Sequence, residues 1–201
     1  MVVSRVACDL SCVDEAAWEA LAAAATHPQA AFRYLNLCTV DAGIRPQARM
    51  VVLRVVDQKR RMLEIHTDIR SPKWQELLVN PQAALLGFCP LTRIQLRLQG
   101  SVKLHWPESD HANAAWETLS VWTRRTYNGG PPGDQLAFGT GSPPITALTG
   151  GLGANGKSHF GVIVFQAHIL DWSELRQQDN RRAHFSYDES GSVTQCQWIN
   201  P

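Results

Sequence analysis

Three short runs between residues 49 and 100 decide the fold that this sequence predicts: Arg49-Met50-Val51-Val52-Leu53-Arg54, Ile65-His66-Thr67-Asp68 and Arg93-Ile94-Gln95-Leu96-Arg97-Leu98-Gln99-Gly100. Short runs rich in Val, Leu and Ile are typical of β-strands. Between the second and third runs lies Ser71-Pro72-Lys73, which predicts the start of a helix. Ser caps free backbone N–H groups there, and Pro suits the first helical position.

The start of this helix is also where the sequence predicts an anion site. A helix N-terminus attracts anions through its unpaired N–H groups and its dipole. Lys73 lies in the first turn, and Arg49, Arg54 and Thr67 add two cations and a hydroxyl. The alternative is a rim of surface cations on a β-barrel. Residues five apart on a flat strand point to opposite faces, so Arg49 and Arg54 require either a bulge or a ligand long enough to meet both.

These motifs resemble the flavin-binding core of the pyridoxamine 5'-phosphate oxidase family, in particular its oxidase-related branch. The shared series is Arg-strand-Arg, Thr-Asp-x-Arg-Ser-x-Lys and Gln-x-Arg-x-x-Gly. The resemblance implies a mainly β fold, a β-barrel with flanking helices known as the FMN-binding split barrel, with FMN as cofactor. The phosphate and ribityl end would be held by Arg49, Thr67, Ser71 and Lys73. The flavin ring would be hydrogen-bonded by Gln95 and flanked by Met50, Val51, Val52, Leu53 and Arg54.

The resemblance is thinner where the family binds substrate. His66 stands where the family usually has an aromatic residue, so it either contacts the flavin or is a plain strand residue. Trp172 resembles the family's flavin-proximal Trp. Arg182-Ala183-His184 has the family's Arg-x-His form, although it lies farther from Trp172 than in the family. We therefore take Arg182 and His184 as candidate catalytic residues that fix and orient an anionic substrate together with Arg54.

The activity that the resemblance implies is FMN-dependent oxidation, with hydride transfer from substrate to flavin N5 and O2 as acceptor. It also implies a homodimer with FMN at the subunit interface and a small phosphorylated substrate. The family's substrate-binding Tyr and Ser have no convincing match near residues 120–128. A flavin- or tetrapyrrole-binding protein of the same fold, without vitamin B6 oxidase activity, is therefore the alternative.

Length and composition agree with a single domain over residues 1–201, and 44% hydrophobic residues suffice for a core. A net charge of +1 argues against a nucleic-acid partner. No apolar run approaches the roughly 18 residues that span a membrane. Five cysteines without a framework indicate reduced thiols in a cytoplasmic protein. The histidines lack ligand spacing, so we expect no metal site.

Hydrophobic periodicity predicts the remaining elements. Helices are expected over about 14–26, 72–79 and 108–120. Strands are expected over 32–40, 46–56, 62–67, 83–88, 94–104, 160–165, 167–172, 182–187 and 193–199.

A Gly/Pro-rich loop is expected over about 127–158, and its end matches the phosphate-loop pattern: Gly151-Leu152-Gly153-Ala154-Asn155-Gly156-Lys157-Ser158. That pattern works only between a strand and a helix. Here a β-type run follows, so we interpret the segment as a Gly-rich linker that enters a strand. A phosphate-loop hydrolase is the third hypothesis.

Overall fold

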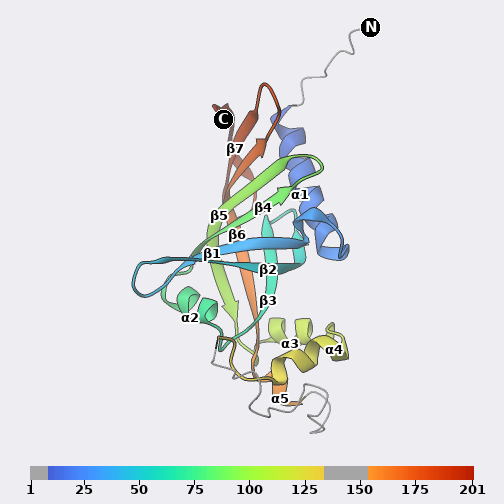
Figure 1. The fold of residues 1–201 in the computed structure, drawn as a ribbon, viewed down its shortest axis with the longest axis vertical. Helices are drawn as coiled ribbons and strands as arrows, with labels where there is room; N and C mark the ends of the chain where they lie inside the picture. The colour runs from blue at the N-terminus through green and yellow to red at the C-terminus, as the bar shows by residue number, and fades with distance from the viewer. Residues whose placement is uncertain (1–8, 134–153) are drawn as a thin grey trace.

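The structure is a computed structural model that describes residues 9–133 and 154–201, and Figure 1 shows its fold. The strands are β1 (Tyr34–Val40), β2 (Pro46–Asp57), β3 (Met62–Asp68), β4 (Gln82–Cys89), β5 (Ile94–His105), β6 (Phe160–Glu174), β7 (Arg181–Tyr187) and β8 (Val193–Ile199). The helices are α1 (Leu10–Thr26), α2 (Pro72–Val79), α3 (Asp110–Glu117), α4 (Val121–Arg125) and α5 (Ala154–Lys157), with 3-10 turns η1 (Ala31–Arg33) and η2 (Thr126–Asn128).

The strands form one antiparallel sheet in the order β3-β2-β1-β4-β5-β6-β7-β8, and β3 also pairs with β6. That additional pairing closes the first six strands of this order into a barrel, which confirms the expected mainly β, split-barrel fold. β6 is long enough to pair with a different strand along each of its halves. Its first half pairs with β3, and its second half pairs with β7, while β5 runs along both. β7 and β8 therefore extend the sheet beyond the barrel.

Alternating side chains of the strands fill the barrel with a continuous apolar core. Leu37, Leu53, Ile65, Leu98 and Phe165 are all fully buried there. The core continues under α1, while α3 to α5 gather at the opposite end of the molecule (Figure 1). A second, smaller core lies between α3 and the start of β6. Both ends of the sheet thus carry a helical cover.

The crossing of β5 and β6 depends on one glycine. The register between these strands shifts at Gln99 and Gly100. A Cβ at Gly100 would lie 1.9 Å from the backbone oxygen of Gln166, which is far inside van der Waals contact. The two backbones can approach this closely only because residue 100 has no side chain.

A network of buried polar side chains attaches α1 to the sheet. The indole of Trp18 donates to the Tyr187 hydroxyl at 3.0 Å, and that hydroxyl donates to Asp14. Arg61 from the start of β3 forms an ion pair with the same carboxylate. Burial nevertheless raises the pKa of Asp14 above its usual range.

Several expected element boundaries need correction. The first helix begins at Leu10 instead of about residue 14. The helix expected over 108–120 is shorter and is α3 (Asp110–Glu117), and the helix that follows it, α4 (Val121–Arg125), was not expected. The side chains of Ser109 and Ser120 cap the starts of these two helices. The two strands expected at 160–165 and 167–172 are one strand, β6. The strand expected from residue 32 begins at Tyr34 after η1.

The expected loop over 127–158 is helical at both ends, in η2 and α5, and its residues 134–153 lie outside the described part of the chain. Across the described residues, none of the helices combines the length and the apolarity that crossing a membrane requires.

Candidate functional site

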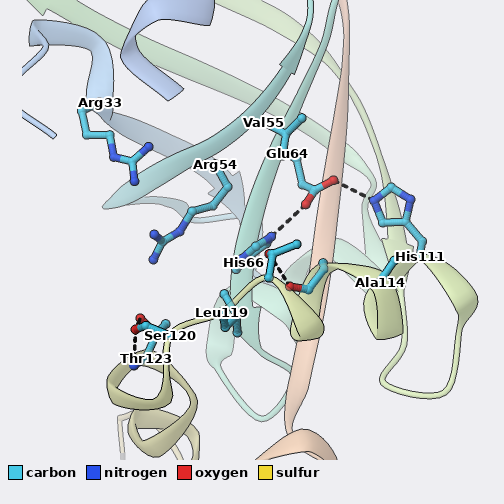
Figure 2. A pocket seen from close by; sticks show the side chains of 12 residues that line it. Arg33, Arg54, Val55, Glu64, His66, His111, Ala114, Leu119, Ser120 and Thr123 are labelled. Carbon is cyan, nitrogen blue, oxygen red and sulfur yellow. Dashed lines mark hydrogen bonds and ion pairs between the residues drawn. The ribbon is translucent and has the colours of Figure 1, made fainter. Parts of the chain in front are cut away.

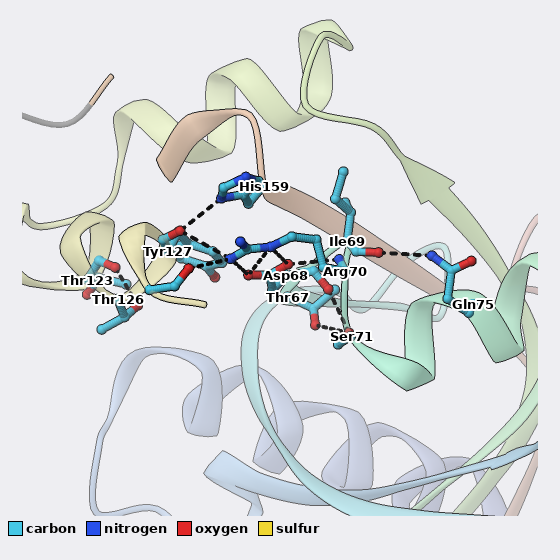
Figure 3. Close-up of polar contacts among 11 residues, drawn as sticks. Thr67, Asp68, Ile69, Arg70, Ser71, Gln75, Thr123, Thr126, Tyr127 and His159 are labelled. Carbon is cyan, nitrogen blue, oxygen red and sulfur yellow. Dashed lines mark hydrogen bonds and ion pairs between the residues drawn. The ribbon is translucent and has the colours of Figure 1, made fainter. Parts of the chain in front are cut away.

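The corner between β3 and α2 brings two predicted hydroxyls together (Figure 3). Thr67 and Ser71 are both buried, with their oxygens 3.4 Å apart. Ser71 precedes α2 as expected, but its side chain does not cap the helix. Its hydroxyl donates instead to the backbone oxygen of Asp68 at 2.6 Å, because the chain turns back on itself at this corner. Arg70 binds the carboxylate of Asp68 and the backbone oxygen of Gly129, which joins the corner to the chain after α4.

Beside this corner lies the Lys73 cluster, which consists of Arg49, Lys73 and Glu76. Arg49 forms an ion pair of 2.7 Å with Glu76 and donates to the hydroxyl of Thr39. Burial, followed by the positive charge of Arg49, lowers the pKa of Lys73 below its usual range. The structure therefore places these two predicted cations near one another, where each disfavours the charge of the other.

Arg54 lies at a β-bulge, as the first of the two explanations that the sequence left open requires. The register between β2 and β3 shifts between Leu53 and Val55. Up to that point, Val51 and Leu53 face the barrel core and are buried, whereas Met50 is 61% exposed. Arg49 contacts Glu76, whereas Arg54 lines a separate cavity, so the bulge does not bring the two arginines to one place. Their contact with different parts of one longer ligand stays a prediction.

Arg54 lines a cavity of about 520 Å³ between β3, α3 and α4 (Figure 2). Arg33 lines it as well, and burial together with the charge of Arg54 lowers the pKa of Arg33. His66 and Glu64, two residues apart on β3, face the same cavity. Hydroxyl-bearing residues of α3 and α4 complete the wall: Thr118, Ser120 and Thr123.

Glu64 holds two histidines in this cavity. Its oxygens lie 2.8 Å from Nε2 of His66 and 2.7 Å from Nε2 of His111. Burial by itself raises the pKa of Glu64, but the hydrogen bonds from His66 and then from His111 more than offset it, so the pKa lies below its usual range. The carboxylate is therefore held in its ionised form.

A row of directly paired residues crosses the outer face of the sheet from β2 to β7. It runs Met50, Asn36, Leu86, Arg97, Asp171, His184. In the neighbouring row, Gln95 pairs with Ser173 and Ser173 pairs with Arg182. Paired residues project to the same face. The predicted residues Met50, Gln95, Arg182 and His184 consequently share one surface, although they come from distant parts of the chain.

On this face lies the Asp171 cluster, which consists of Arg97, Asp171 and Arg182. The side chain of Asp171 is only 4% exposed and binds both guanidinium groups. Arg182 contacts it twice, at 2.9 and 2.7 Å. Burial by itself raises the pKa of Asp171, but the hydrogen bond from Arg182 and the charge of Arg97 bring it below its usual range. The same contact raises the pKa of Arg182.

Trp172 faces the opposite way and is buried. It packs against Trp198 and lines a second cavity, of about 450 Å³, beneath α1. Its predicted contact with the flavin remains a prediction.

The phosphate-loop-like segment has a structural explanation where it is described. A Cβ at Gly156 would meet Asn128 Oδ1 at 2.4 Å, so this glycine lets α5 pack closely on η2. Lys157 lies 3.8 Å from Glu117. α5 has four residues and leads into β6, and residues 151–153 of the pattern lie outside the described part of the chain.

Sequence reasoning missed Glu64, Glu76, His111 and Asp171. Glu64 could have been found, because residues two apart on a strand share a face and His66 was already a candidate. The others meet their partners only through tertiary packing.

Comparison with known proteins supports the predicted family. Residues 15–106 match the family model described as pyridoxamine 5'-phosphate oxidase, FMN-binding domain. Residues 15–106 therefore belong to the pyridoxamine 5'-phosphate oxidase-like family. A pyridoxine/pyridoxamine 5'-phosphate oxidase from Bordetella petrii is 35% identical over 111 residues, which cover 53% of this chain and 50% of that protein. One from Burkholderia cenocepacia is 39% identical over 93 residues, which cover 46% and 41%. The chain thus spans half or less of each of these two relatives.

Two solved structures share the fold. A pyridoxamine 5'-phosphate oxidase-related, FMN binding protein from Nostoc punctiforme superposes with a TM-score of 0.74 and 24% identity, over 93% of this chain and 96% of that one. PhzG from Burkholderia lata, in complex with tetrahydrophenazine-1-carboxylic acid, superposes with a TM-score of 0.67 and 17% identity, over 84% and 82%. At these identities, both likenesses show the fold alone.

Proposed function

We propose that the chain binds FMN at the Lys73 cluster and uses it to oxidise a small anionic substrate. The observation that carries the proposal is the convergence of Arg49 and Lys73 beside the hydroxyls of Thr67 and Ser71. A half-buried lysine with a lowered pKa next to a second cation is poised for a phosphate, because a dianion offsets both charges. The donor set fits the phosphate of FMN.

Bound FMN supplies the hydride acceptor, and the protein supplies binding and orientation. Arg49 and Lys73 would hold the phosphate, and Thr67 and Ser71 the ribityl end. The ring would lie toward Gln95, along the strand from Met50 to Arg54, within reach of His66. Arg54 and Arg182 would fix the anionic group of the substrate, His184 would orient it, and O2 would reoxidise the flavin.

The outer face of the sheet supports a homodimer with the flavin between the subunits. Tyr34, Met50 and Phe88 are 54%, 61% and 45% exposed on this face. Large exposed apolar side chains on the same surface as charged candidate residues are typical of interaction sites. Light scattering after gel filtration should give twice the chain mass of 22.3 kDa.

The test of the cofactor is the visible spectrum of the purified protein. Flavin absorption bands are expected, either at once or after FMN is added and the excess removed. Colourless protein that does not retain added FMN would contradict the proposal.

One observation favours the alternative of a flavin- or tetrapyrrole-binding protein without vitamin B6 oxidase activity. Arg182 is already engaged by Asp171 through two hydrogen bonds, so its charge is partly compensated. Incubation with FMN, O2 and pyridoxine or pyridoxamine 5'-phosphate separates the two. Aldehyde formation supports the oxidase, and bound FMN without aldehyde supports the alternative.

A further inference from the structure

The cavity behind Arg54 contains two buried polar atoms without a partner among the described residues. They are Nδ1 of His66 and Nε of Arg54, and both residues line the cavity. A buried polar atom that lacks a hydrogen bond costs about 1–3 kcal/mol. Two such atoms beside one cavity indicate a ligand that satisfies both. It must offer a hydrogen-bond donor to His66 and an acceptor to Arg54.

The protonation of His66 follows from its partner. An ionised carboxylate can only accept hydrogen bonds. Since Glu64 lies 2.8 Å from Nε2 of His66, that nitrogen must carry the hydrogen. In the neutral form of the ring, which a general base requires, Nδ1 is then an acceptor, and the side chain of His66 is only 5% exposed. The ring also packs edge-on against Phe160, with ring centroids 5.1 Å apart, which limits its rotation.

We propose that His66 is a general base that takes the proton from the hydroxyl or amine of an anionic substrate bound in this cavity. The inference rests on the proposed function. In the oxidation of an alcohol, the carbon would lose a hydride, with its two electrons, to the acceptor that bound FMN would supply. The hydroxyl proton goes to Nδ1 of His66, and the carbon–oxygen double bond forms.

Glu64 acts through His66 and is a positioning residue. It holds the ring with Nδ1 available and stabilises the imidazolium that forms, as a carboxylate does for histidine in hydrolases. His111 binds the second oxygen of Glu64 and stacks on His105, with ring centroids 4.4 Å apart. The other charged groups that face these three residues are Arg33 from η1, Arg54 and Asp57 from β2, Arg60 from the β2–β3 turn, and Lys103 and His105 from β5.

The contact is tested by nitrogen NMR of histidine-labelled, FMN-loaded protein with the flavin reduced, so that no turnover occurs. Pyridoxine 5'-phosphate and pyridoxamine 5'-phosphate are the probes. One Nδ1 signal should move on addition, and it should be the signal that His66→Phe removes. The signal of His168, which lies at Ser101 on the far part of β6, is the internal control. An unmoved His66 signal with both probes at saturating concentration overturns the inference.

The proton step is tested by anaerobic bleaching of the flavin as a function of pH. General base catalysis contributes roughly 10²–10⁴-fold, so His66→Phe should slow bleaching by that factor and flatten its pH profile. Glu64→Gln should slow it as well and move the rising limb of the profile, whereas His168→Gln should match wild type. Wild-type rate and profile in both cavity variants would overturn the inference and leave the oxidase function standing. No bleaching in wild type would refute the oxidase function and the proton step together, while the NMR response still decides the contact.

Discussion

The Lys73 cluster and the Asp171 cluster each contain two cations and one carboxylate, yet their electrostatics differ. In the Asp171 cluster the carboxylate is buried between the two arginines, its own pKa is lowered and the pKa of Arg182 is raised. In the Lys73 cluster, Glu76 is engaged by Arg49, and the pKa of Lys73 is lowered by burial and by Arg49. One cluster stabilises its charges internally, whereas in the other the attraction of Lys73 to Asp68 and Glu76 does not offset burial and the charge of Arg49. The second is therefore the better receptor for an added dianion.

The largest expected effect is on FMN binding. Lys73→Ala should raise the FMN dissociation constant roughly 10- to 150-fold, because a charge-assisted contact to phosphate contributes about 1.5–3 kcal/mol. Quenching of FMN fluorescence on titration measures it. Lys59→Ala, in the exposed β2–β3 turn, is the matched control. An unchanged dissociation constant would remove the Lys73 cluster as the phosphate site.

Loss of the shared carboxylate should affect stability instead of cofactor binding. Asp171→Ala leaves Arg97 and Arg182 side by side without their counter-ion. The free energy of unfolding should fall by about 1–2 kcal/mol, at the lower end for charged groups because both arginines are partly exposed. Denaturant unfolding measures it, with Glu189→Ala as a surface control. Stability equal to wild type would mean that water replaces the carboxylate fully.

The contributions of the two clusters to stability should change at opposite ends of the pH scale. A lysine whose folded pKa is lowered below 10.5 costs the folded state stability at neutral pH, and the cost disappears as pH rises toward 10.5. FMN-free Lys73→Met should thus be more stable than wild type at pH 7, by no more than about 1 kcal/mol, with the difference closing in alkali.

For Asp171, whose folded pKa is lowered below 3.8, the stabilisation is present above 3.8 and is lost as pH falls through the folded pKa. Asp171→Asn should therefore be less stable than wild type at pH 7 and converge with it in acid. Denaturation midpoints at neutral, alkaline and acid pH measure both differences, and parallel pH curves for either pair would contradict the assignment.

The smallest effect separates the two arginines of the Asp171 cluster. Arg182 contacts Asp171 through two nitrogens, whereas Arg97 contacts it through one. Arg182→Gln should therefore cost about 0.5 kcal/mol more stability than Arg97→Gln. Equal losses in thermal unfolding would show that the second contact contributes nothing.

Local signals predicted much of this fold. Ser71-Pro72 placed α2, which spans Pro72–Val79 as expected, and alternation placed β8 over Val193–Ile199. The helix expected over 108–120 was found as α3, but it ends at Glu117, and the sequence did not predict α4, whose start Ser120 caps. β6 was divided at Gln166 because a polar residue interrupts its apolar run where the strand passes from barrel to extension.

The sequence predicted which residues belong to the candidate site better than it predicted the direction in which their side chains point. Family motifs pointed to Arg49 and Lys73, which the structure does bring together. That Val51, Leu53 and Trp172 face the core follows from strand register, which a one-residue bulge resets. Glu76 is 27 residues from Arg49 in the sequence, and Asp171 is 74 residues from Arg97. No local pattern could therefore predict these two pairs.

The close crossing at Gly100 has a consequence for how the molecule comes apart. Since β6 belongs at once to the barrel and to the extension, loosening one loosens the hydrogen-bond ladder of the other. A methyl group at position 100 would push β5 and β6 apart where they approach most closely. The Lys73 cluster and the Asp171 cluster would then lose their alignment together.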